Sequence, residues 1–161
     1  MPPRRETPGR KAPAPTTGLE TADIRRRIRE AIADAHLTGP EARRARTARA
    51  EEVGSELLER IAAPLFRTVA AALTAEGYRF TVSMPPGAVR LTSDASGDDY
   101  VEFALDTKRD PAAMLIRSAR VRRDEGMIDE RVVAEHPAIG ALTDAHLFTA
   151  LLTALRFVVD R

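Results

Sequence analysis

The hydrophobic pattern of this chain changes its period at Gly77, and that change limits the possible folds more than any other feature. Before Gly77, apolar side chains recur every three or four residues, as they do on one face of a helix. After Gly77, apolar and polar side chains alternate in short runs between turns, which predicts an antiparallel meander with one buried face. In a chain of 161 residues, this combination favours one α+β domain in which helices precede the sheet.

The first helix is expected over 19–37, where Ile24 and Ile28 lie on one apolar stripe. Charged residues flank that stripe on both sides. The basic flank contains Arg25, Arg26 and Arg29, and the acidic flank contains Asp23, Glu30 and Asp34. The apolar side of this helix is therefore expected to pack against another surface.

A second helical segment is expected over about 40–76. Its first third offers only alanines as apolar groups, whereas a core stripe begins at Val53 and continues through Leu57 and Ile61. Pro64 lies within that stripe and is expected to kink or break the helix near residue 64. Unbroken, the segment would be roughly 55 Å long, more than the width of a domain of this size. Part of it must therefore project, fold back or contact a second chain.

The remainder of the chain is predicted to form five strands and a final helix. The strands are expected near 78–82, 89–92, 100–106, 113–122 and 127–135. The final helix has apolar residues over more than half of its circumference, so we expect it to lie between the sheet and another element. The expected fold class is α+β, with N-terminal helices, a five-stranded antiparallel β-meander and a C-terminal helix packed on one face of the sheet.

This order of a long helix, a meander and a helix resembles the RWD-type domains of eukaryotic adaptor proteins, many of which follow a dimerising helix. The resemblance covers about 50–161 and concerns topology alone, so it transfers no residue roles. Within the helical region at 19–76, we expect about 53–76 to form one core with 77–161. Residues 1–18 contain five prolines and four basic side chains, so we expect them to form a disordered tail.

Charge is distributed unevenly along the chain. Residues 1–50 carry a net charge of +6 and residues 51–161 a net charge of −5. Of the 25 basic residues 23 are Arg, and the chain has no Asn or Gln, the side chains that pair bidentately with adenine. The Arg-rich segments are instead suited to binding the phosphates of a nucleic acid without contacts to particular bases. The candidate phosphate contacts are Arg25, Arg26, Arg29, Arg43, Arg44, Arg46 and Arg49.

Motifs for catalysis and metal binding are weakly represented. The chain has no Cys, and none of His36, His136 and His146 lies at the spacing of a metal-binding pair. The phosphate-binding patterns GxGxxG and GxxxxGK and the nucleophile pattern GxSxG are absent. The turn at 94–99 resembles half of a calcium loop, but Leu105 stands where such a loop needs a Glu. We therefore expect no catalytic residue, no cofactor and no metal, and a protein that is not an enzyme.

Two groups of charged residues in the predicted sheet have structural explanations. Glu102 shares a strand face with Asp106, and Arg90 on the neighbouring strand is its natural partner, so we expect a solvated cross-strand ion pair. The basic residues that close the fourth strand are expected to protect a sheet edge from aggregation. They are Arg117, Arg120, Arg122 and Arg123.

The function that these features favour is non-catalytic protein–protein interaction or self-association through the Ala- and Arg-rich helices at 19–60. The expected assembly is a homo-oligomer, and the expected interface residues are Ile24, Ile28, Val53, Leu57 and Ile61. Two alternatives stay open: sequence-independent nucleic-acid binding through the Arg-rich N-terminal third, and a small-molecule or peptide pocket between the meander and the last helix. The absence of an 18-residue apolar run and of a secretory signal predicts a cytoplasmic protein with no membrane span.

Overall fold

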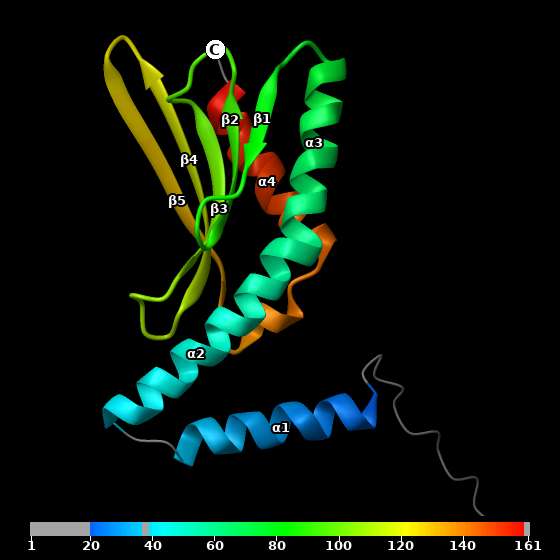
Figure 1. The fold of residues 1–161 in the computed structure, drawn as a ribbon, viewed down its shortest axis with the longest axis vertical. Coiled ribbons are helices and arrows are strands. Elements are labelled where there is room, and N and C mark those ends of the chain that lie inside the picture. Colours follow the sequence, from blue (N-terminus) through cyan, green and yellow to red (C-terminus); the bar gives the residue numbers. More distant parts are fainter. Residues whose placement is uncertain (1–19, 37–38, 160–161) are drawn as a thin grey trace, which may run out of the picture. The chain divides into compact units, whose positions relative to one another are not determined.

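The computed structural model describes residues 20–36 and 39–159, without the side chain of residue 34. The expected N-terminal tail lies outside these residues. The chain divides into two compact units, Met1–His36 and Leu37–Arg161. The described element of the first unit is helix α1 (Thr21–His36), and all the other helices and the sheet belong to the second unit (Figure 1).

In the second unit, three consecutive helical elements precede the sheet. They are α2 (Gly39–Leu57), a π-helical turn (Leu58–Ala62) and α3 (Ala63–Ala75). The first backbone N–H after the π turn donates to the carbonyl of Leu58, five residues earlier. Pro64 comes next and has no N–H to donate, so the regular helical ladder is interrupted at this point.

The sheet is a meander in which each strand pairs antiparallel with the next one along the chain (Figure 1). Its strands are β1 (Phe80–Ser83), β2 (Ala88–Ser93), β3 (Tyr100–Asp106), β4 (Ala113–Arg122) and β5 (Glu125–Glu135). A 3-10 turn (Ala138–Ala141) then leads to α4 (Asp144–Val159). The expected α+β class, the five-stranded antiparallel meander and the C-terminal helix packed against it are confirmed.

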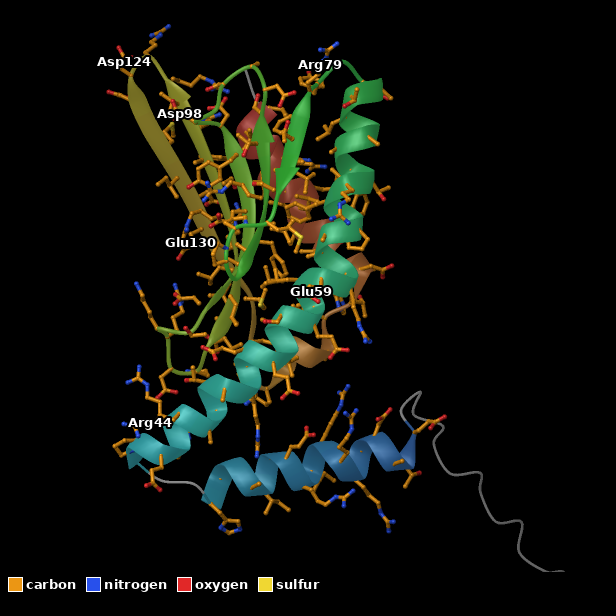
Figure 2. All side chains as sticks on the ribbon, in the orientation of Figure 1. Arg44, Glu59, Arg79, Asp98, Asp124 and Glu130 are labelled. Carbon is orange, nitrogen blue, oxygen red and sulfur yellow. The ribbon has the colours of Figure 1, made fainter. Side chains whose placement is uncertain are left out.

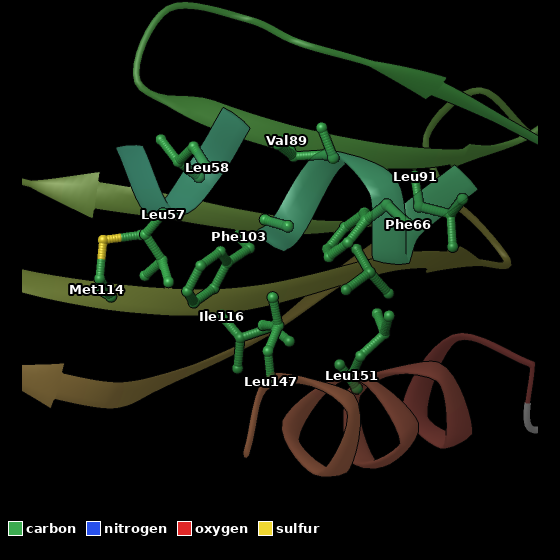
Figure 3. Close-up of a cluster of buried hydrophobic side chains, with 14 of the residues drawn as sticks. Leu57, Leu58, Phe66, Val89, Leu91, Phe103, Met114, Ile116, Leu147 and Leu151 are labelled. Carbon is green, nitrogen blue, oxygen red and sulfur yellow. The ribbon is translucent and has the colours of Figure 1, made fainter. Parts of the chain in front are cut away.

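The core lies between one face of the sheet and two helices. α3 packs against β1 and β2, and α4 packs against β3, β4 and β5. Figure 3 shows Phe66 of α3 and Leu147 and Leu151 of α4 meeting Leu91 and Phe103 of the sheet, all of which are fully buried. We call this side of the sheet the inner face. The opposite side is the outer face, and its central row is Ser83, Arg90, Glu102, Arg117 and Glu130.

Helix α4 contacts the sheet and, less extensively, the π-helical turn. Phe148 and Leu152 lie on its other side and are each 42% exposed, so neither element covers that part of its apolar surface. Apolar periodicity shows that a helix has a wide apolar surface, but it does not show how many neighbours cover it. Within 20–36 and 39–159, every helix is too short or too polar to cross a membrane.

Helix α4 begins with an N-cap at Thr143. The Thr143 hydroxyl accepts a hydrogen bond from the N–H of His146, and His146 Nδ1 accepts one from the N–H of Thr143, both at 3.3 Å. This reciprocal pair is a capping box in which His takes the usual place of Glu or Gln. His146 therefore has a structural role at the helix end.

Candidate interaction surfaces

The apolar stripe of α1 is exposed. Ile28 is 52% exposed and Ile32 is 51% exposed, while Ile24 is half-buried. Beside the stripe, Arg26 Nη2 lies 2.9 Å from the carboxylate of Asp23. A helix of 16 residues is only marginally stable by itself in water, and burial of its apolar side is the usual source of further stability. The stripe therefore makes α1 a candidate docking element.

The other three expected interface residues belong to the core of the second unit. Leu57 is buried in the cluster between the helices and the sheet, and Val53 and Ile61 pack against that cluster. These side chains stabilise the fold itself. The exposed part of the expected interface is therefore on α1.

The arginines of α2 that were expected to grip phosphates have neighbours in the same unit. Arg43 and Arg46 both approach Asp110, in the turn between β3 and β4, with nitrogen–oxygen distances of 3.9 and 3.6 Å. Arg43 also donates to the carbonyl of Lys108 at 3.4 Å. Arg44 is exposed near the N-terminal end of α2 (Figure 2). The basic end of α2 is thus tied to the β3–β4 turn.

These contacts offset part of the positive charge near the N-terminal end of α2, where cations gain nothing from the helix dipole. Asp110 is the neighbouring carboxylate for two of the four arginines, and ion pairs as exposed as these contribute little to stability. Of the remaining candidates, Arg49 is half-buried on α2, and Arg25 and Arg29 are exposed on α1.

A row of charged side chains crosses the outer face of the sheet. The register aligns Arg90, Glu102, Arg117 and Glu130 on four neighbouring strands. Arg90 Nε donates to Glu102 at 2.8 Å, and Arg117 Nη1 donates to the other oxygen of that carboxylate at 3.3 Å. Arg117 also donates twice to Glu130, at 2.9 and 2.7 Å, and Arg109 donates to Glu130 at 3.3 Å. The row is a continuous network of alternating charge, the arrangement that favours cross-strand pairing.

The centre of this row is Glu102, which is 5% exposed. The expected partner, Arg90, is confirmed, but the expectation of a solvated pair is wrong because the carboxylate is buried between Arg90 and Arg117. Both Glu102 oxygens accept from these arginines, so the carboxylate is engaged in holding three strands together. Arg90 also lies 4.5 Å from the centre of the Tyr100 ring. The pKa of Arg117 is raised, chiefly by its hydrogen bond to Glu130, although burial acts in the opposite direction.

The arginines near the end of β4 do not protect an edge, because β4 is paired on both sides. Arg120 donates to the carbonyl of Phe157 at 3.1 Å and lies 4.7 Å from the centre of its ring. Arg122 donates to the carbonyl of Val158 at 3.1 Å and to the buried carboxylate of Asp99 at 2.8 Å. The last carbonyls of a helix lack partners and carry partial negative charge. These two arginines therefore stabilise the end of α4, which corrects the expected role in edge protection.

Two hollows border α4, where the sequence left a ligand pocket open as an alternative. The larger, of about 810 Å³, lies between the turn after α3, the β2–β3 turn and the end of α4, and its charged lining includes Asp99 and Arg122. Those two side chains already bond each other. The smaller, of about 260 Å³, lies between α4 and β5 and is lined by Asp129, Arg131 and His146 among others. In the smaller hollow, Arg131 donates to Asp129 at 2.9 Å. In both hollows, charged groups of the lining are therefore already paired with each other, whereas a ligand site needs polar groups that are free to orient the ligand.

The turn at 94–99 uses its carboxylates within the sheet. Asp94 accepts from the Thr81 hydroxyl at 2.7 Å, and Asp99 accepts from the N–H of Val121 at 2.8 Å. Among residues 20–36 and 39–159, no group of three or more His, Asp and Glu side chains is arranged to hold a metal ion.

The free edge of the sheet is not among the surfaces expected from the sequence. β5 is the last strand, and its side chains Ile128 and Val132 are exposed on the outer face. The alternation around Glu130 was visible in the sequence, but which strand is at an edge follows only from the strand order. Glu130 lies midway along this strand (Figure 2).

Comparison of the chain with protein-family models, with curated proteins and with solved structures finds no match. The resemblance to RWD-type domains therefore rests on the order of elements alone.

Proposed function

We propose that this protein is a non-catalytic interaction module that associates with itself through α1. The observation that carries the proposal is the exposure of Ile28 and Ile32 on one side of a short, otherwise polar helix. Burial of this stripe in a helix pair removes apolar area from water and stabilises the helix at the same time.

Charged side chains lie on both sides of the stripe. Arg25 and Arg29 lie on one flank, and Asp23 and Glu30 lie on the other, together with the exposed Arg27. A second copy of α1 therefore meets both opposite and like charges at these flanks, which influence orientation in paired helices. The apolar stripe between the flanks carries the association.

The test compares the mass of the full chain with that of two variants by light scattering on a sizing column. The variant Ile28→Asp with Ile32→Asp places two charges in the stripe and is expected to lower the mass of the assembly. Its matched control, Ala22→Asp with Ala33→Asp, adds the same charges on the exposed polar side and is expected to keep the full mass. A wild-type chain that is monomeric at every concentration refutes the proposal, as does a stripe variant with the wild-type mass.

Nucleic-acid binding through the arginines is the less favoured function. Arg26, Arg43 and Arg46 have carboxylate neighbours, which lowers the positive charge available to phosphates. Binding of that kind weakens steeply with salt, so retention on DNA at low salt and release at moderate salt separates it from association through an apolar stripe. The cytoplasmic location expected from the sequence stays a prediction.

A further inference from the structure

We infer that the free edge of β5 pairs with β5 of a second copy of this chain, antiparallel, about a twofold axis at Glu130. This goes beyond the proposed role of α1, because it concerns a different surface. β5 is the last strand of the sheet, so within the described residues one of its edges faces no other strand (Figure 1). From Glu125 to Val132 its register against β4 is unbroken. A regular, uncovered edge of this kind is a template for a further strand.

The outer face of this edge strand carries two exposed aliphatic side chains among its charged ones. Ile128 is 67% exposed and Val132 is 44% exposed, and both lie on the outer face with Glu130 between them. Proteins normally blunt an edge strand with charges or Pro, because exposed β-branched side chains there promote pairing. Two such side chains flanking a single charge suit an edge that is covered in an assembly.

The sequence of β5 is complementary to itself about Glu130. An antiparallel twofold axis pairs residues that are equally far from it on the two strands. With the axis at Glu130, Ile128 meets Val132 of the second copy. Asp129, which accepts a hydrogen bond from Arg131 of its own copy at 2.9 Å, also meets Arg131 of the second copy. Each of these registers sets one charged residue against itself, but moving the axis by one residue also places Glu130 opposite an aliphatic side chain. Charge and hydrophobicity therefore select the register at Glu130 over its neighbours.

The charge at the axis is balanced within each copy. Each Glu130 accepts two hydrogen bonds from Arg117, at 2.9 and 2.7 Å, and one from Arg109 at 3.3 Å. The two carboxylates therefore meet with four guanidinium groups around them.

The pairing joins the two sheets into one sheet of ten strands. On the outer face, the pairing aligns a row of apolar cross-strand neighbours in one copy with such a row in the other copy. In the first copy, the row is Tyr100, Ala119 and Ile128. In the second copy, the row is Val132, Leu115 and Ala104. Within each copy, apolar rows and charged rows alternate along the outer face. The same alternation continues across the interface.

The register is tested by exchanging charges, in the background of Ile28→Asp with Ile32→Asp so that α1 does not contribute. Asp129→Arg or Arg131→Asp alone turns two cross-copy ion pairs into two like-charge contacts, and is expected to raise the dimer dissociation constant about tenfold in sedimentation velocity. The combined variant restores both pairs and is expected to return the constant to within about threefold of the background value. Ser83→Lys, on the opposite edge strand β1, is the matched control and is expected to leave it unchanged.

Crosslinking provides a second readout that does not depend on the strength of association. The chain has no Cys, so single Ile128→Cys and Val132→Cys variants each carry one thiol. Mixed and oxidised, they are expected to form a covalent dimer, because these positions face each other across the axis. Either variant alone is expected to stay uncrosslinked, because identical residues lie about 14 Å apart along the strands. A mixture that fails to crosslink, a crosslink in either variant alone, or an exchanged pair that stays dissociated overturns the inference.

Discussion

Replacing Glu102 by Gln tests whether the row of charges on the outer face stabilises the fold. Glu102 is buried and accepts hydrogen bonds from Arg90 and Arg117, on the strands at either side of β3. Gln keeps the shape of the side chain and one acceptor, but it removes the negative charge between two guanidinium groups. The substitution therefore isolates the charge and leaves the packing nearly unchanged.

The magnitude follows from burial. Loss of one partner of a fully buried ion pair costs about 3–5 kcal/mol. The side chains of Arg90 and Arg117 are 38% and 36% exposed, so water solvates part of the charge that is left behind. We therefore expect Glu102→Gln to lower the free energy of unfolding by about 2 kcal/mol, and Tm by roughly 8 °C for a unit of this size.

Glu130→Gln is the matched control, because it changes the same chemical group in the same row at a more exposed position. The Glu130 side chain is 33% exposed, whereas that of Glu102 is 7% exposed. We expect the control to lower the free energy of unfolding by about 1 kcal/mol or less. The measurement is thermal and urea unfolding followed by circular dichroism. Equal destabilisation by the two substitutions, or an unchanged Tm for Glu102→Gln, would refute the argument that burial sets the contribution of this row.

Three further changes test local features of the fold. Gly54→Ala is expected to alter the free energy of unfolding by less than about 0.5 kcal/mol in urea unfolding. The gain in helix propensity offsets the close contact of the new Cβ, which lies 2.9 Å from the flexible end of the Leu105 side chain. Gly54→Leu overfills the same space and is expected to destabilise the fold by about 1–3 kcal/mol. Thr143→Ala removes the N-cap of α4 and is expected to cost about 1 kcal/mol in the same measurement; an unchanged midpoint would show that the capping box does not contribute. Arg122→Met leaves the buried Asp99 carboxylate without its guanidinium partner and is expected to cost about 2 kcal/mol, with protection of the last amides of α4 from hydrogen exchange falling at the same time. A loss of stability with unchanged exchange at the end of α4 would contradict the helix-end role of this arginine.

The local elements were predictable because their determinants are local. The change of period at Gly77, the turns between strands and the Thr143 cap are all encoded within a few neighbouring residues. The pairing of Arg90 with Glu102 was also predictable, because short turns between consecutive strands leave little freedom in the register.

The sequence by itself determined that this chain forms helices followed by an antiparallel meander, since periodicity and turn chemistry act over short distances. The tertiary structure alone decided which of these surfaces are covered. Because β4 lies inside the sheet, Arg122 does not protect an edge and donates instead to the end of α4. Glu102 is buried between the two arginines that flank it, and the strand order leaves Ile128 exposed at a free edge. Burial and edge position depend on neighbours that are distant in the sequence, so a pattern within one segment can show that a surface is apolar or charged, but not what faces it.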